Sequence, residues 1–497
     1  MRLLFTGILL FACLPLFAAE ARDSVESTLD YSMSHTMPGD SSSAVADEDR
    51  PELTATDYLI WPFSHIIQPA LNILIYPFAA PVHYANESRL LDKAEKLAAL
   101  GPNHNIYLYP TFNLKPGTRT QLGVTYRHRN MLLRKDYFVA QASLFANSDL
   151  YFSTRYSKRN LFGSDFVVGG RLEWSLDRNA EMSVPRSLTL FDSNEPFLYT
   201  DSSYSAQLRL GHPVPFVRNM DFQIEGNAEH KYFDYPDIED SVLTDHPMFK
   251  PNERGMYQRF YQFPLKLTLT YDNTDAPFVP TRGSRISTTW RYVNVTKYHG
   301  ENITSRSNTL NHDFQRLDFV AQHYFYLGKD DSQYGLSVKE AREFRKFYTD
   351  FSWEETMRLW RPENIRTTLL NRRVLAVQLR LSEMWEMEKG GAPFSAFPTA
   401  GGTYPLRGYT MRFTDYSVKG ISLEYRWPID HLVDGVIFDE YVMYGRHWYS
   451  LDGEKMVNSW GFGIRVRKPD LYLFRIQLAF HGFDGFAAIC TVAPEFQ

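Results

Sequence analysis

The stretch "DFVVGGRLEWS", residues 165–175, shows the pattern that decides the fold of this chain. Apolar or small residues stand at every second position from Phe166 to Trp174, and Arg171 and Glu173 stand between them. Side chains alternate between the two faces of a β-strand, so this spacing predicts a strand with one apolar and one polar face. The same alternation returns in the segments SYSAQLRLG, DFQIEGNAEH, PLKLTLTYD, ISLEYRWP, SWGFGIRVR and YLFRIQLAF.

Two fold classes use such strands. In a soluble sandwich the apolar faces point at each other, whereas in a membrane barrel they point at lipid and the polar faces line the lumen. The alternation places sixteen strands near residues 105–113, 118–130, 134–146, 149–158, 165–176, 202–212, 219–232, 260–272, 284–295, 313–327, 371–388, 417–428, 434–449, 457–468, 470–483 and 485–496. The even number favours a bacterial outer-membrane barrel, as do the long connections 177–201, 233–259, 296–312 and 389–416, which all follow odd strands, and the mostly short connections after even strands. The sequence therefore predicts an all-β fold, a 16-stranded antiparallel transmembrane β-barrel over residues 105–497.

Composition agrees with this fold and excludes other classes. Aromatic residues make up 15% of the 497 residues, as the aromatic girdles of a barrel require. The net charge is −5 and no basic stripe is present, which argues against a nucleic-acid partner. The two cysteines, Cys13 and Cys490, form no zinc-binding pattern, and we expect neither a metal nor a cofactor.

The first 104 residues divide into three parts ahead of the barrel. Residues 1–21 combine Arg2, an apolar run and a small-x-small site, which predicts a cleavable signal peptide; a lipoprotein signal at Cys13 is the alternative, disfavoured by Phe11 and by the apolar residues that continue past it. Residues 22–55 are acidic and Ser-rich, which is typical of a disordered tether. Residues 56–104 are interpreted as a short helical or irregular periplasmic segment.

Two helical segments are expected. Asn86 as N-cap and Gly101 as C-cap residue enclose an amphipathic pattern, so we expect a helix there, packed under or in the barrel or plugging it. Residues 328–370 also show a helical pattern and fall in a connection between strands that should lie on the periplasmic side. No function is predicted for this insertion.

Four stretches, in this order, resemble the Omp85 superfamily of BamA/TamA-like outer-membrane proteins, also called the surface-antigen D15 family. They are YDNTDAPFVPTRGSRIS (271–287), GGTYPLRGY (401–409), LEYRWPI (423–429) and GVIFDEY (435–441). The second stretch is similar to the sixth extracellular loop of the family, with Arg407, Gly408 and Tyr409 at its tip. The resemblance covers roughly residues 260–496.

The resemblance implies that this loop folds back into the lumen and that Arg407 meets Glu424 and Asp439 on the inner wall. A guanidinium offers a planar fork of donors that suits carboxylates, and Gly408 would let the chain turn without a β-carbon. A solvated Arg407 is the alternative, and lumen lining alone would also explain Glu424. Glu440 follows Asp439 where the family usually has a small residue, and the alternation breaks there.

The turn after the eighth strand carries the family's Asp-rich strand end and Pro-Thr-x-Gly turn. Its residues are Asp272, Asp275, Pro280, Thr281 and Gly283. Aspartates in such positions bond nearby backbone groups, so we interpret Asp272 and Asp275 as turn residues and not as a metal site.

The family implies a non-enzymatic barrel that helps to insert or translocate protein or lipid, with outer-membrane lipid and unfolded outer-membrane proteins or lipids as partners and clients. Residues 22–104 contain no convincing periplasmic (POTRA) repeat of the family, and Phe496 is followed by Gln497 where a terminal aromatic is usual. A passive channel or structural barrel is therefore the alternative. An enzyme is disfavoured because the sequence contains neither Gly-x-Ser-x-Gly nor His-Glu-x-x-His.

Overall fold

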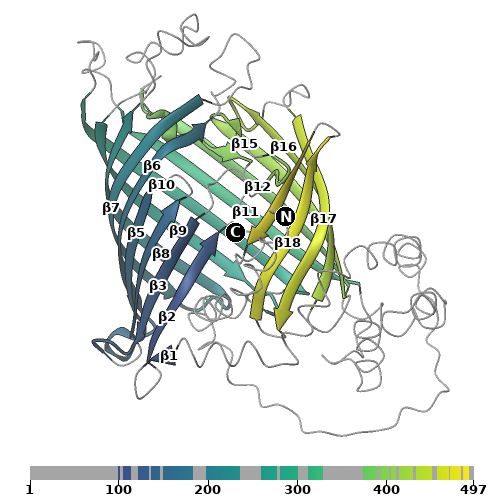
Figure 1. Ribbon diagram of the computed structural model, residues 1–497, viewed down its shortest axis with the longest axis horizontal. Coiled ribbons are helices and arrows are strands. Elements are labelled where there is room, and N and C mark those ends of the chain that lie inside the picture. The colour runs from purple at the N-terminus through teal and green to yellow at the C-terminus, as the bar shows by residue number, and fades with distance from the viewer. Residues whose placement is uncertain are drawn as a thin grey trace, which may run out of the picture.

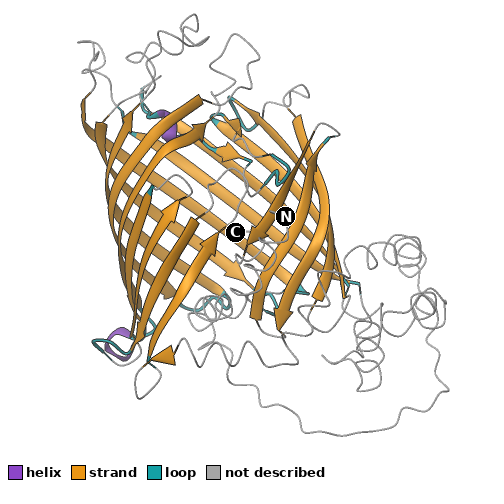
Figure 2. Cartoon of the chain, in the orientation of Figure 1, coloured by secondary structure: helices purple, strands orange, loops and turns teal. Residues whose placement is uncertain are grey.

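The protein is a β-barrel built from one antiparallel sheet (Figure 1). The computed structural model describes residues 99–100, 105–113, 121–133, 136–145, 149–182, 197–234, 259–276, 280–299, 312–327, 373–388, 392–401, 405–409, 413–428, 433–449, 456–468, 471–482 and 485–491. Strands dominate this part of the chain, and its helices are the short 3₁₀ turns Leu161–Gly163 and Phe394–Ala396 (Figure 2).

Sixteen strands follow one another around the wall, each paired antiparallel with the next along the chain from β2 to β19. These strands are β2 (Ile106–Asn113), β3 (Gln121–Arg129), β4 (Asp136–Phe145), β5 (Leu150–Lys158), β6 (Val167–Met182), β7 (Phe197–Pro213), β8 (Met220–Asp234), β9 (Arg259–Asp272), β10 (Gly283–His299), β11 (Phe314–Tyr326), β12 (Val374–Glu386), β15 (Ser417–Pro428), β16 (Val433–Gly445), β17 (Met456–Lys468), β18 (Leu471–His481) and β19 (Gly485–Thr491). Three two-residue strands are added: β1 (Ala99–Leu100) on β2, and the pair β13 (Thr399–Ala400) and β14 (Phe413–Thr414). The predicted number of barrel strands is confirmed.

The two faces of the sheet differ as the alternation predicts. Large apolar side chains on the outer face are exposed, among them Leu172, Leu208, Phe263, Leu267 and Phe486. The inner face carries the polar partners, for example the ion pair of Glu225 with Lys266 and the bonded pair of Thr268 and Thr289. An apolar outside and a polar inside are the reverse of a soluble protein and fit a barrel surrounded by lipid.

Strands β6 and β7 are longer than the sequence pattern predicts. They continue to Met182 and from Phe197, with a register shift between Asp177 and Ala180. The polar residues after Leu176 indicate a loop by their composition, but they still pair across the hairpin. Beyond the membrane both faces of a hairpin meet water, so a strand there needs no apolar face.

One part of the expected N-terminal helix is wrong. Ala99 and Leu100 form β1 and pair with Tyr107 and Ile106 of β2, because these residues of β2 can bond a second segment on the side away from β3. The rest of the helix expected over 86–101, the signal peptide, the tether and the helical insertion over 328–370 lie outside the described residues.

None of the helices in the described part of the chain is long and apolar enough to cross a membrane.

Candidate functional site

The connection between β12 and β15 enters the barrel and forms a tight turn at residues 405–409. The amide of Gly401 donates to the carbonyl of Pro405 at 2.8 Å, and that of Tyr409 donates to the carbonyl of Leu406 at 3.2 Å. Leu406 has a φ of 72°, a left-handed conformation that costs a non-glycine residue free energy and needs support from its surroundings. Leu406 is fully buried, and this packing supplies that support.

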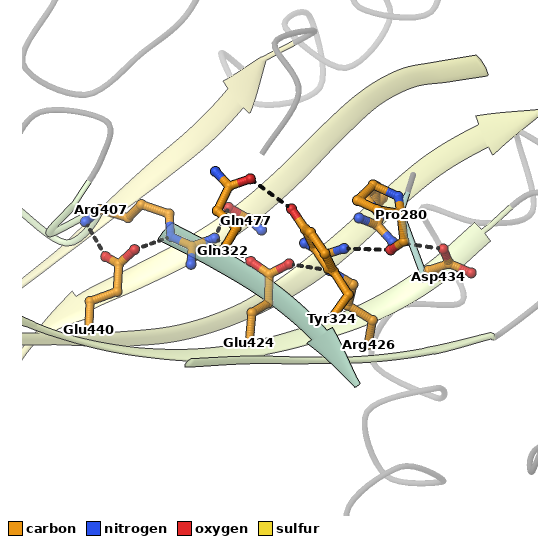
Figure 3. A network of polar contacts seen from close by, with 10 residues as sticks. Pro280, Gln322, Tyr324, Arg407, Glu424, Arg426, Asp434, Glu440 and Gln477 are labelled. Carbon is orange, nitrogen blue, oxygen red and sulfur yellow. Dashed lines mark hydrogen bonds and ion pairs between the residues drawn. The ribbon is translucent and has the colours of Figure 1, made fainter. Parts of the chain in front are cut away.

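Arg407 lies at the tip of this turn and is completely buried, as are Glu424 and Glu440. Its Nη1 donates to Oε2 of Glu424 at 3.0 Å and to Oε1 of Gln477 at 3.1 Å. Its Nε donates to Oε1 of Glu440 at 2.8 Å, and its backbone amide donates to Oε2 of the same carboxylate at 2.7 Å. Figure 3 shows the guanidinium between the two carboxylates. Charge-assisted bonds of this kind are stronger than neutral ones, and burial removes competing water.

Aromatic and apolar side chains surround these polar contacts. The guanidinium lies 3.5 Å from the centre of the Phe438 ring, close enough for a cation–π contact. Leu406 packs with Ala400, Phe413, Val418, Val442 and Tyr444, and Tyr409 packs against the same cluster. The loop is therefore held by both ionic and hydrophobic contacts.

The residue after Arg407 fits closely against the wall. Gly408 donates its amide to Oγ of Ser459 at 2.7 Å, and its carbonyl lies 2.9 Å from Nδ1 of His481. A β-carbon at Gly408 would lie 2.5 Å from the carbonyl oxygen of Phe480, which is too close for any side chain. The ring of Tyr409 lies 4.9 Å from the ring of His481.

These contacts correct the expected acidic partner of Arg407. The structure brings Arg407 to Glu424 as the resemblance implies, but the second carboxylate belongs to Glu440 and not to Asp439. Asp439 points to the opposite face of β16, where it accepts a hydrogen bond from Asn458 at 2.7 Å. The physical reason is the two-residue period: Val436, Phe438, Glu440 and Val442 are all buried on the inner face, and Asp439 falls between them.

We expect the substitutions Glu440→Gln and Asp439→Asn to separate these two positions. Glu440→Gln breaks the buried ion pair of Arg407 with Glu440 and should lower the free energy of unfolding by about 3 kcal/mol. Asp439→Asn keeps an acceptor oxygen for Asn458 and should change it by less than about 1 kcal/mol. The measurement is urea unfolding of the reconstituted barrel, followed by tryptophan fluorescence. A larger loss for Asp439→Asn would contradict this assignment.

Three further residues complete the site: Ser459 on β17, and Gln477 and His481 on β18. Sequence reasoning missed them. Their only signal is that each is polar on an inward-facing position, and many inward positions of this barrel are polar. Which of them reaches the loop depends on the register of β15 to β18 and on how far the loop enters the lumen.

The turn between β9 and β10 is built by its two aspartates. Asp272 accepts bonds from the amide and hydroxyl of Thr274 at 3.0 and 2.6 Å. Asp275 accepts bonds from the amides of Thr281 and Arg282 at 2.8 and 3.1 Å and from the Thr281 hydroxyl. These are the turn contacts expected for Asx residues.

Gly283 closes this turn. It has a φ of 98°, and a β-carbon there would lie 2.6 Å from the carbonyl oxygen of Asn273, so no other residue fits without strain. No group of three or more acidic, histidine or cysteine side chains in the described part of the chain could hold a metal ion.

A second arginine connects this turn to the loop. Arg426 donates from Nε to Oε1 of Glu424 at 2.6 Å and from Nη1 to the carbonyl of Pro280 at 3.5 Å. Glu424 therefore lies between Arg407 and Arg426 (Figure 3). The β9–β10 turn and the β12–β15 loop come from opposite ends of the barrel, so this series of contacts runs along the inner wall from one end toward the other.

A match to a known protein family shows which family this barrel belongs to. Residues 130–485 match the Omp85 superfamily domain. The chain belongs to the Omp85 superfamily. Omp85 proteins are outer-membrane proteins of Gram-negative bacteria that handle protein or lipid clients. No curated protein matches this sequence.

Solved Omp85-type structures are similar to this chain at low sequence identity. A BamA from Haemophilus ducreyi lacking POTRA domains 1–3 has 12% identity and a TM-score of 0.48, over 78% of this chain and 70% of that one. CdiB from Escherichia coli has 12% identity and a TM-score of 0.45, over 79% and 64%. CdiB from Acinetobacter baumannii has 10% identity and a TM-score of 0.41, over 78% and 57%. This chain spans less than two thirds of the length of both CdiB chains.

Proposed function

We propose that this Omp85 protein is a non-enzymatic barrel that assists the insertion or translocation of protein or lipid at the outer membrane, to which a cleavable signal peptide directs it. The observation that carries the proposal is the arrangement around Arg407. The loop contacts four consecutive strands, through Glu424 on β15, Glu440 on β16, Ser459 on β17 and Gln477 on β18. This braces the wall next to β19, the last strand of the series.

A braced wall beside the last strand suits a barrel that works at the edge between β19 and β2. Backbone groups in lipid must be paired, and a strand edge that opens will template an incoming strand. Ala487 and Ala488 in β19 provide little side-chain packing to hold a neighbour. Because the loop would hold the four strands from β15 through β18 in place, any opening would be confined to the edge between β19 and β2, and the rest of the barrel would stay intact.

A passive channel or structural barrel is the second candidate. The polar inner face of β6 to β9, with Arg171, Glu173, Glu225 and Lys266, favours it because such a surface suits water and ions. In that case the loop would only narrow the lumen.

The test is the folding of an unfolded outer-membrane protein into liposomes. We expect liposomes that contain this protein to accelerate folding over empty liposomes, and Arg407→Ala to lose most of the acceleration. The matched control is Arg171→Ala, which removes an arginine from a partly exposed lumen pair on β6 and should retain the acceleration. Folding at the rate of empty liposomes, together with ion conductance, would contradict the proposal and favour the channel.

A further inference from the structure

A row of aromatic rings crosses the outer face of five neighbouring strands, from β5 to β9. The cross-strand register places Phe152 beside Trp174, Trp174 beside Tyr204, Tyr204 beside His230 and His230 beside Tyr261. Ring centres are 6.2 Å apart for Trp174 and Tyr204, 6.1 Å for Tyr204 and His230, and 4.7 Å for His230 and Tyr261. The row therefore forms a continuous ridge.

Small residues lie next to this ridge and leave a groove. Ala206 and Ala228 face each other in register, and Gly226 follows on the same face of β8. Nothing lies within 4 Å of the position that a β-carbon of Gly226 would take. The groove has a volume of about 450 Å³ and is flanked by Leu172 and Phe263. This volume falls within the ~300–1,000 Å³ range of small-molecule sites.

A positive charge lies beyond the ridge, toward the barrel end that carries the Arg407 loop. Arg259 pairs with Tyr232, one step past the pair of His230 and Tyr261 on the same outer face. Its side chain is exposed, and its guanidinium lies 5.3 Å from the centre of the Tyr232 ring. Aromatic belts mark the boundary between lipid and water, and a guanidinium there suits a phosphate.

The backbone around the groove distinguishes its possible occupants. Strands β6, β7 and β8 are each paired on both sides, so their ladder bonds are already made. An extended peptide in the groove would bring unpaired backbone groups into lipid, where each costs free energy. An alkyl chain brings no polar group, and its headgroup phosphate would meet Arg259.

We propose that this groove binds an acyl chain of an anionic, phosphate-bearing membrane lipid whose headgroup lies at Arg259. The apolar floor and the aromatic ridge hold the chain, and the arginine selects the headgroup. This site is separate from the loop contacts around Arg407, because it lies on the outer face of other strands.

The test uses the full chain in vesicles that contain phosphatidylglycerol with a photoactivatable group on one acyl chain. Cross-linking should concentrate on peptides of β6 to β9. Diacylglycerol that carries the same labelled chain should cross-link to these peptides less than phosphatidylglycerol does. Ala206→Phe with Ala228→Phe fills the groove and should lower cross-linking there by about tenfold, because the acyl chain can no longer cover the apolar floor. Arg259→Gln should lower it for phosphatidylglycerol but not for diacylglycerol.

Two control variants match these changes. Ala321→Phe adds the same ring at an outward position of β11, and Arg218→Gln removes an exposed arginine from the turn between β7 and β8 at the other barrel end. Both should keep the cross-linking pattern. Labelling spread evenly over all outward strands of the wild type would mean ordinary surrounding lipid and overturn the proposal. Cross-links of β6 to β9 to another protein in native membranes would also overturn it.

Discussion

Arg407→Ala is expected to lower the free energy of unfolding by about 3–5 kcal/mol, the cost typical of removing one partner of a buried ion pair. The side chains of Arg407, Glu424 and Glu440 are all fully buried. Alanine in place of Arg407 removes the cation that pairs with Glu440, while Glu424 keeps its ion pair with Arg426. The free energy of unfolding from urea titration of the reconstituted barrel measures this loss.

Two further variants show where the cost arises. Glu440→Gln added to Arg407→Ala should recover part of the loss, because it removes the carboxylate left without a cation. Arg171→Ala breaks an ion pair whose side chains are 32% and 27% exposed, and should cost about 1 kcal/mol or less. Equal stability of Arg407→Ala and the wild type would show that the pair contributes nothing to the fold.

The strands of the barrel could be predicted from sequence because a wall between lipid and water imposes a strict two-residue period. Each strand repeats this period, so errors in one segment do not affect the next. The extension of β6 and β7 could not be predicted in the same way, since outside the membrane the apolar face is no longer required. Strand β1 has no such pattern and depends on the neighbouring edge of β2.

The site could be predicted in part. The resemblance provided Arg407 and Glu424, while the position of the second acid came from family likeness and was wrong by one residue. A one-residue shift moves a side chain to the other face of a sheet. The two-residue period of β16 already indicates Glu440 as the second acid, because Glu440 lies on the same face of the strand as Val436, Phe438 and Val442. Ser459, Gln477 and His481 required the three-dimensional register.

Gly408→Ala is expected to release the loop from the wall even though it removes no charge. The new β-carbon would lie 2.5 Å from the carbonyl oxygen of Phe480 and 2.8 Å from Oγ of Ser459. The first of these atoms belongs to the backbone of β18 and cannot rotate away, so the turn itself must shift. Overpacking of this kind costs about 1–3 kcal/mol, and it acts on the contacts that position Arg407.

Trypsin measures this release directly, because it cleaves after arginine and Arg407 is completely buried in the native loop. The bond between Arg407 and Gly408 should resist cleavage in the folded wild type, and Gly408→Ala should be cut there while the barrel remains folded. Gly226→Ala is the matched control, since nothing lies near the β-carbon it adds; it should leave the bond protected. Equal protection in Gly408→Ala would mean that the wall yields to the new methyl group, and that close contact at Gly408 is not what holds the loop.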